Sequence, residues 1–233
     1  ELARKGILLR KYGQELIQAI AGKKIHGVAA TPGGVQKSLT IKERDRFLTG
    51  TDLPSIDTII QWAKESVDLM KGYHEQNRSW MDDFAVYPSG HLGLVKEDGA
   101  LELYNGRMRA IDTNGALILP DVPDYKYLEY FAEGLERWSY LKFPYLISRG
   151  RENGWNRVGP LARLNVCDYI PSPMAEAERL EYFAFNGKKP VERTLYYHWA
   201  RLIEMLHCAE LIRELLNDPA ILGGELTATG KRR

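Results

Sequence analysis

The feature that most constrains the fold is a change of hydrophobic periodicity between residues 87 and 119. Apolar and polar residues alternate there with a period of two, and Asp98-Gly99, Asn105-Gly106 and Asn114-Gly115 separate the short runs. Asp-Gly and Asn-Gly supply the residues with positive φ that tight hairpins require. The pattern therefore predicts an antiparallel β meander over this stretch.

Helical spacing of apolar residues is found on both sides of the meander. The first helix is expected to end at Gly22, and Pro54-Ser55 to precede the second. Together the predicted helices cover residues 2–21, about 56–80, about 125–138, about 174–185 and about 191–216. We therefore expect an α+β fold, in which a mainly helical body carries a small antiparallel β subdomain.

These patterns divide the chain into three segments. Residues 1–86 form a helical segment that contains the loop around His26, residues 87–119 form the β subdomain, and residues 120–233 form a helical segment of the same body as the first. Residues 223–233 are expected to be a frayed tail.

Charge and composition exclude several classes of protein. The 32 lysines and arginines balance 31 aspartates and glutamates, which is not the footprint of a nucleic-acid binder. No apolar run approaches the roughly 20 residues of a membrane span. With two cysteines and no signal peptide, the chain is expected in the cytoplasm.

One candidate site is the sequence Gly22-Lys-Lys-Ile-His-Gly27, followed by Pro32-Gly33-Gly34. These glycines predict a rigid loop whose backbone can approach another group closely. In the plain alternative, His26 is a surface residue that hydrogen-bonds a nearby carbonyl. The glycines match neither a P-loop nor a Gly-x-Gly-x-x-Gly dinucleotide loop, so no NAD site is visible.

A second candidate region holds Arg157 and Arg163 around Gly159-Pro160. They either bridge helices by salt bridges or support a functional pocket or interface. A third is the predicted helix with Glu204 and His207, three residues apart on one face. A di-iron site of this kind needs two Glu-x-x-His motifs, and only one is present, so a hydrogen-bonding network of Arg201 with Glu204 is preferred to a metal site. Cys167 and Cys208 are expected to be core thiols.

Residues 22–35, 157–165 and 197–210 together resemble the large subunit of cytoplasmic, NAD-reducing nickel-iron hydrogenases, and the resemblance extends over nearly the whole chain. That family holds its metals with two Cys-x-x-Cys pairs, one near each terminus, because soft thiolates suit nickel and iron. The isolated Cys167 and Cys208 offer no such pair. The sequence is therefore interpreted as a central fragment, with no catalytic residue and no metal ligand of its own.

The resemblance implies the remaining expectations. The complete protein would hold a nickel-iron centre, oxidise H2 reversibly and pass electrons through iron-sulfur clusters to NAD, whereas no cofactor is expected in this chain. The implied partners are the small iron-sulfur subunit together with the NAD- and flavin-binding diaphorase subunits, and the fragment itself could self-associate. The residues implied to lie near the metal pocket or a subunit interface are His26, Pro32, Gly33, Gly34, Arg157 and Arg163. His26 in particular is implied to donate a hydrogen bond to a cluster sulfur.

Other interpretations stay open at this point. A sulfur- or deazaflavin-linked hydrogenase shares the Gly-Pro-Leu-Ala-Arg segment at 159–163. The quinone-site subunit of respiratory complex I has lost its metal cysteines, which suits a chain without cysteine pairs. A helical scaffold without chemistry is the remaining alternative.

Overall fold

A computed structural model describes residues 1–187 and 190–228. The chain divides into two compact units, residues 67–207, which we call the central unit, and residues 1–66 together with 208–233, which we call the terminal unit. Within the described residues, no helix combines the length and the apolar character needed to cross a membrane. The expected tail over 223–233 lies partly outside these residues.

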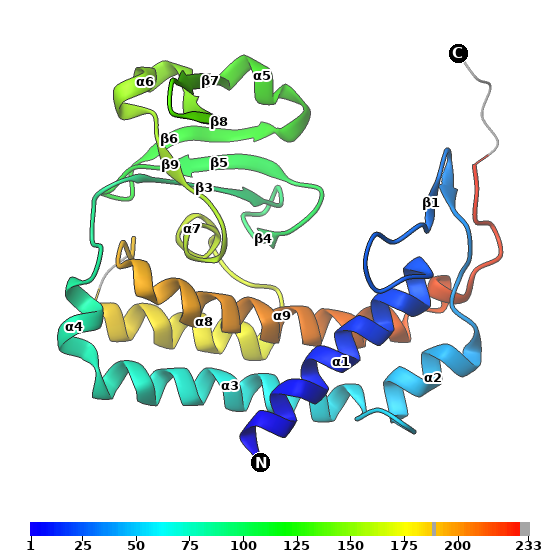
Figure 1. The fold of residues 1–233 in the computed structure, drawn as a ribbon. Coiled ribbons are helices and arrows are strands. Elements are labelled where there is room, and N and C mark those ends of the chain that lie inside the picture. The colour runs from blue at the N-terminus through cyan, green and yellow to red at the C-terminus, as the bar shows by residue number, and fades with distance from the viewer. Residues whose placement is uncertain (188–189, 229–233) are drawn as a thin grey trace. The chain divides into compact units, whose positions relative to one another are not determined.

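In the terminal unit, the long helix α1 (Leu2–Ala21) ends where the sequence predicts (Figure 1). Gly22 has φ 74°, and its N–H donates to the carbonyl of Gln18. The buried face of α1 includes Tyr12, whose hydroxyl donates to the Phe47 carbonyl at 3.1 Å. Phe47 belongs to α2 (Ile41–Thr49), a helix that the sequence analysis did not predict. A capping box between Thr40 and Glu43 starts it.

The rest of the terminal unit comes from both ends of the chain. A short hairpin is formed by β1 (Ala30–Thr31) and β2 (Gly34–Val35), and Gly34 forms an isolated antiparallel bridge with Thr227. Helix α3 (Ile56–Gln76) begins in this unit and α9 (Tyr197–Asn217) ends in it, followed by the 3-10 helix η4 (Pro219–Leu222).

The central unit contains the predicted meander. Its strands are β3 (Gly90–Val95), β4 (Leu101–Glu102), β5 (Arg107–Ile111) and β6 (Leu117–Pro123), paired antiparallel in the order β4-β3-β5-β6. Positive φ at Gly99 and Gly115 forms two of the turns, which confirms that part of the prediction. A further strand, β9 (Asn156–Arg157), pairs parallel to β3 and was not predicted.

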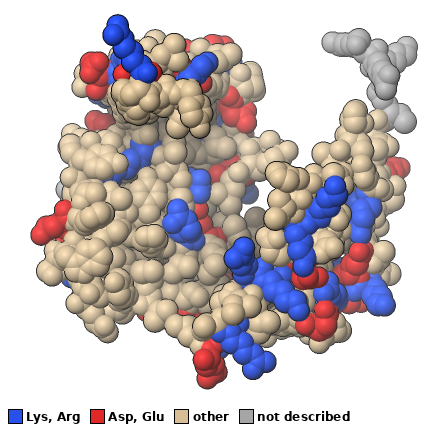
Figure 2. All heavy atoms as spheres, in the orientation of Figure 1, with Lys and Arg blue, Asp and Glu red and all other residues tan. Residues whose placement is uncertain are grey.

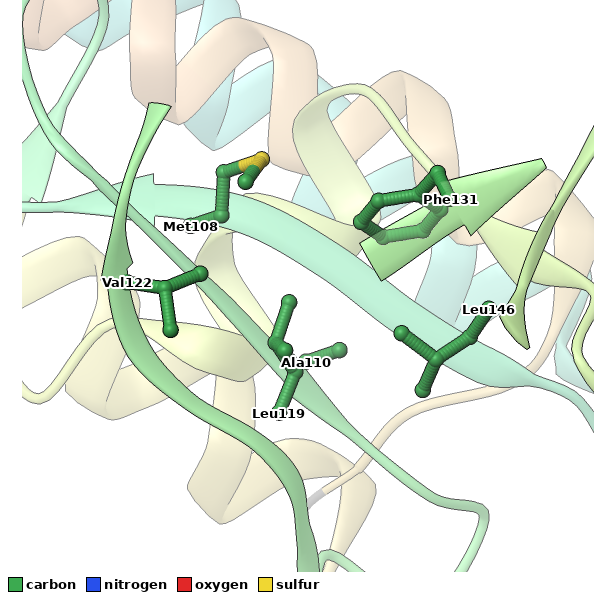
Figure 3. Packing of buried hydrophobic residues seen from close by; sticks show 6 residues of the cluster. All are labelled: Met108, Ala110, Leu119, Val122, Phe131 and Leu146. Atoms are coloured by element: carbon green, nitrogen blue, oxygen red, sulfur yellow. The ribbon is translucent and has the colours of Figure 1, made fainter. Parts of the chain in front are cut away.

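The predicted helix over 125–138 is wrong. Only the 3-10 helix η1 (Asp124–Lys126) and one turn, α5 (Tyr127–Tyr130), are helical, and a hairpin of β7 (Phe131–Glu136) and β8 (Ser139–Leu146) follows. Phe131 and Leu146 pair across this hairpin and are buried with Met108, Ala110, Leu119 and Val122 of the sheet (Figure 3). A helix would lose this pairing and would carry Gly134 in its interior, which costs about 1 kcal/mol relative to alanine.

The central unit also contains most of the helices. The predicted helix over 56–80 is interrupted at Asn77, so that α3 is followed by the separate helix α4 (Arg78–Asp83). The helices predicted near 174–185 and 191–216 are confirmed as α8 (Pro173–Asn186) and α9, although α9 begins at residue 197. The short elements are η2 (Ile147–Arg149), α6 (Gly150–Asn153), α7 (Pro160–Val166) and η3 (Thr194–Tyr196).

Helix α7 packs against the sheet, on the side where Figure 1 shows α8 and α9. A Cβ on Gly93 of β3 would lie 2.6 Å from the Val166 side chain, so the absence of a side chain at 93 permits this close packing. The molecule thus has an α+β fold in which a mainly antiparallel sheet is covered by helices, as expected, but its β part extends well beyond residue 119.

Gly34 provides a test of the terminal unit. A Cβ at this position would lie 2.0 Å from the carbonyl oxygen of Leu226, a backbone atom that has little room to move. We expect Gly34→Ala to lower the free energy of unfolding by about 1–3 kcal/mol, as overpacking does. Chemical denaturation followed by circular dichroism measures this.

The matched control is Gly13→Ala in the middle of α1, where a Cβ would have no neighbour within 4 Å. Helix propensity predicts a gain of about 0.5–1 kcal/mol there. Equal effects of the two substitutions would contradict the pairing of Gly34 with the 226–228 segment.

Candidate functional site

The loop around His26 is compact and exposed. His26 has φ 53°, a left-handed conformation that is uncommon for a residue with a side chain. The Val28 N–H donates to the Ala21 carbonyl at 2.9 Å and closes the loop directly onto the end of α1. A Cβ on Gly27 would lie 2.6 Å from the Ala21 Cβ, so glycine is required by this close approach.

Ion pairs hold the base of this loop. Lys24 donates to Glu15 at 2.6 Å, and Arg46 of α2 reaches the same carboxylate at 3.1 Å. The hydrogen bonds from Lys24 and Arg46 lower the pKa of Glu15 from its ordinary value. The imidazole of His26 is therefore presented from a fixed support while remaining open to solvent.

The Pro32-Gly33-Gly34 segment forms the turn between β1 and β2. Gly33 has φ 91°, which suits the position after proline in a type II turn. The Gly33 carbonyl accepts from the Ala228 N–H at 2.9 Å, and the Val35 N–H donates to the Leu226 carbonyl at 2.9 Å. The glycines thus permit the approach of another backbone, as the sequence analysis expected, and here that backbone is the 226–228 segment of the same chain.

Arg157, on β9 of the central unit, is buried and anchors two segments of backbone. Its guanidinium donates to the carbonyls of Tyr87 at 2.8 Å and of Glu192, and it lies 4.1 Å from the centre of the Tyr87 ring. These contacts connect residues 87 and 192 to the strand that carries Arg157. They are not the helix-bridging salt bridge of the plain alternative.

Arg163 does form such a bridge. Its guanidinium binds the Glu204 carboxylate with two parallel hydrogen bonds of 2.7 Å, which join α7 to α9. The network expected between Arg201 and Glu204 is therefore incorrect. Arg201 is exposed and Glu204 is buried, so the partner comes from the neighbouring helix α7 and not from the same helix.

Loss of the Arg163 side chain leaves a buried carboxylate without this partner. The side chain of Glu204 is 9% exposed and that of Arg163 is 28% exposed, so we expect Arg163→Met to cost about 2 kcal/mol, below the range for fully buried pairs. A second substitution, Glu204→Leu, should recover most of this loss in a double-mutant cycle of denaturation measurements.

The control for this prediction is the exposed pair of Lys142 with Glu133, whose side chains are 58% and 44% exposed. Lys142→Met should change the stability by no more than about 0.5 kcal/mol. A loss at Arg163 as small as that at Lys142 would contradict a structural role for the buried pair.

His207 and the two cysteines form no metal site with Glu204. The Nδ1 atom of His207 lies 2.7 Å from the Ser172 hydroxyl, and Cys167 is buried with its thiol directed at the Leu164 carbonyl. Cys208 is only half-buried, so the expectation of a core thiol is right for Cys167 alone. The described residues include no group of three or more histidine, cysteine, aspartate or glutamate side chains that could hold a metal ion.

The described residues do not fit a nickel-iron centre, which needs several converging thiolates. Cys167 belongs to the central unit and Cys208 to the terminal unit. We therefore derive no chemical step through that centre, and its presence in the full-length protein stays a prediction.

The six candidate residues fall into two groups. His26, Pro32, Gly33 and Gly34 belong to the terminal unit, and Arg157 and Arg163 to the central unit. Sequence reasoning missed His91, a fully buried histidine on β3 that contacts Asn165 of α7. The alternation of the meander could have placed His91 on the inner face, but its partner comes from a distant helix.

The surface carries charges of both signs and several exposed apolar side chains. Basic and acidic groups stand together over α1 and α2 in Figure 2, where Arg46 pairs with Asp52 and Lys37 with Glu43. Large exposed side chains gather in and near the β7–β8 hairpin of the central unit, namely Leu128, Leu135, Trp138, Tyr140 and Leu141. The surface therefore offers apolar area for contact without a field of one sign.

Comparison with known proteins shows what this fold resembles. No protein-family model matches the chain. It is 41% identical over 230 residues to subunit beta of the NAD-reducing hydrogenase HoxS of Cupriavidus necator, covering 98% of this chain and 47% of the relative. It is 38% identical over 228 residues to a vhu subunit of the F420-non-reducing hydrogenase of Methanococcus voltae, covering 98% of this chain and 52% of the relative.

A solved structure agrees with these relatives. A crystal structure of an NAD+-reducing [NiFe]-hydrogenase in the H2-reduced state matches with a TM-score of 0.92 and 42% identity, over 100% of this chain and 50% of that one. The chain thus spans about half the length of the relatives that it matches. Its α+β fold is that of a hydrogenase subunit.

These comparisons correct the assignment to a large, catalytic subunit. The relatives are named as beta or vhu subunits of hydrogenases, and none of these names identifies a large catalytic subunit. What the comparisons support is coarser, a relationship to subunits of hydrogenases, which are oxidoreductases. The alternative interpretations as a complex I relative or a scaffold have no better support.

Proposed function

We propose that this chain is part of a subunit of a cytoplasmic, NAD-reducing nickel-iron hydrogenase, similar to subunit beta of the HoxS enzyme. The observation that carries the proposal is the 41% identity to that subunit, which extends over 98% of the chain. The solved NAD+-reducing [NiFe]-hydrogenase, with its TM-score of 0.92, supports the same kind of enzyme.

The proposal includes contacts with other subunits, among them NAD- and flavin-binding subunits and an iron-sulfur subunit. The exposed His26 loop is the contact that we propose first, because ion pairs fix its base while the imidazole stays open to solvent. An imidazole there can donate a hydrogen bond to a cluster sulfur and so favour the reduced cluster. Pro32, Gly33 and Gly34 support the neighbouring hairpin, whereas Arg157 and Arg163 fix the central unit.

Purification of the full-length protein with an affinity tag tests the function. We expect partner subunits that contain iron-sulfur clusters and flavin to copurify, with nickel in the complex and H2-dependent reduction of NAD+. A protein that purifies alone and reduces neither NAD+ nor an artificial dye with H2 would refute the proposal.

The role of the loop needs its own variant. His26→Ala in the full-length complex should lower H2-dependent NAD+ reduction roughly tenfold while the nickel content stays unchanged, as substitutions beside a metal group commonly do. Lys11→Ala on the exposed side of α1 is the matched control and should leave the rate unchanged. Loss of nickel in the histidine variant, with full activity per remaining nickel, would reject this role.

A further inference from the structure

The central unit fixes the tautomer of His91 through a neighbouring amide. The Nδ2 atom of Asn165 donates to the Val191 carbonyl, and its Oδ1 accepts from the Val191 N–H, both at 2.9 Å. These two bonds determine which end of the amide is nitrogen. The same Nδ2 lies 3.2 Å from Nδ1 of His91, and because an amide nitrogen only donates, Nδ1 must accept.

The proton of the neutral ring therefore lies on Nε2 of His91. Burial lowers the pKa of this histidine to about 4, with the nearby Arg157 charge as the second cause, so the ring is neutral near pH 7. His91 is fully buried, and its Nε2 has no hydrogen-bond partner among the residues that the structure describes. One N–H donor is thus left over inside the protein.

A second unsatisfied donor belongs to the residue directly opposite. Arg157 pairs with His91 in the parallel register of β9 and β3, and paired residues on neighbouring strands project to the same face of a sheet. Arg157 is 6% exposed. The contacts described above use its two terminal nitrogens, whereas its Nε has no partner within residues 1–187 and 190–228.

Two buried donors on one face, one of them on a cation, require an acceptor. Buried polar groups are almost always hydrogen-bonded, and a buried charge is normally compensated. The groups that the guanidinium contacts, two carbonyls and the Tyr87 ring, carry no full negative charge.

We propose that a single small acceptor, a halide ion or a water oxygen, is bound between Nε2 of His91 and Nε of Arg157. The positive charge favours a halide, and the burial of both donors limits the guest to about one atom. Such a guest would join β3 to β9 at the position where Arg157 also holds residues 87 and 192.

Crystals of the protein grown with sodium bromide test the site. We expect an anomalous peak within hydrogen-bond distance of both nitrogens for a halide, or a well-ordered peak without anomalous signal at that position for water. His74, the other fully buried histidine, is the internal control, because its ring lies against Tyr196 and Trp199 and not beside an arginine. A well-resolved map with no peak between His91 and Arg157 would overturn the proposal.

Solution NMR gives an independent result. Long-range 1H–15N correlation should show the Nε2–H tautomer of His91 at pH 7.5, with magnetisation transfer from water to that proton if the guest is water. The Nδ1–H tautomer would overturn the proposal.

Substitution of the arginine completes the test. Arg157→Met should abolish bromide binding, whereas Arg163→Met, which removes an arginine already paired with Glu204, should leave it intact. Bromide bound equally in both variants would also reject the site. If Arg157→Met does not fold, the crystallographic and NMR results on the unmodified protein still decide.

Discussion

Lowering the pH from 7.5 to 4.5 is expected to reduce the free energy of unfolding of the central unit by about 5 kcal/mol. Two fully buried histidines, His74 and His91, each contribute about half of this loss. Burial is the first cause of the lowered pKa of both rings, which is about 4 in each case. Asp82 acts against this shift at His74, and Arg157 adds to it at His91.

The direction of the effect follows from proton binding. Because the folded-state pKa is below the ordinary value of 6.5, the unfolded chain binds more protons than the folded one between pH 6.5 and 4. The contribution of these rings is complete above pH 6.5 and falls as the pH falls towards 4. Glu43, whose hydrogen bonds with Lys37 and Thr40 lower its pKa to about 2, stays ionised over this range.

Guanidinium denaturation at several pH values measures the loss. His74→Phe removes one of the two titrating rings and should reduce the pH dependence by about half, whereas His198→Phe, at an exposed position, is the control and should leave it unchanged. A stability that does not change between pH 7.5 and 4.5 would show that the two rings are hydrated or paired in solution.

The second large effect is expected for Trp199. Its side chain is 1% exposed and lies at the centre of an aromatic cluster. The ring centres of Tyr182 and Phe185 are each 5.2 Å away, and that of His74 is 5.3 Å away. We expect Trp199→Ala to lower the free energy of unfolding by about 3–5 kcal/mol, because it removes the largest side chain of the cluster and leaves a cavity.

Trp138 is the matched control. It is a tryptophan of the same unit but is 76% exposed at the β7–β8 hairpin, so Trp138→Ala should change the stability by no more than about 0.5 kcal/mol. Both values come from chemical denaturation monitored by far-ultraviolet circular dichroism, which does not depend on tryptophan emission. Similar losses in the two variants would contradict the packing described for α8 and α9.

The elements that local signals specify are the ones that the sequence predicted correctly. Gly22 ends α1 because glycine alone adopts its left-handed conformation at no cost, and Asp-Gly and Asn-Gly place turns of the meander. Helix α2 was missed although Thr40 and Glu43 form a capping box that is readable in the sequence. That error was one of interpretation and not of missing information.

Other features depend on contacts between distant residues. Phe131 and Leu146 are buried against the sheet, and this tertiary packing outweighs the local helical pattern over 125–138. The parallel pairing of β9 with β3 likewise joins residues more than 60 positions apart, and no local pattern encodes it.

The candidate site divides in the same way. By itself the sequence determined the α+β class, the turns and the conformation of the glycine loop, because backbone preferences act within a few residues. Only the tertiary structure decided that Arg163 pairs with Glu204 and not Arg201, and that Arg157 holds backbone carbonyls beside His91. The physical reason is that a buried charge takes whichever partner the packing of other elements brings within hydrogen-bond distance.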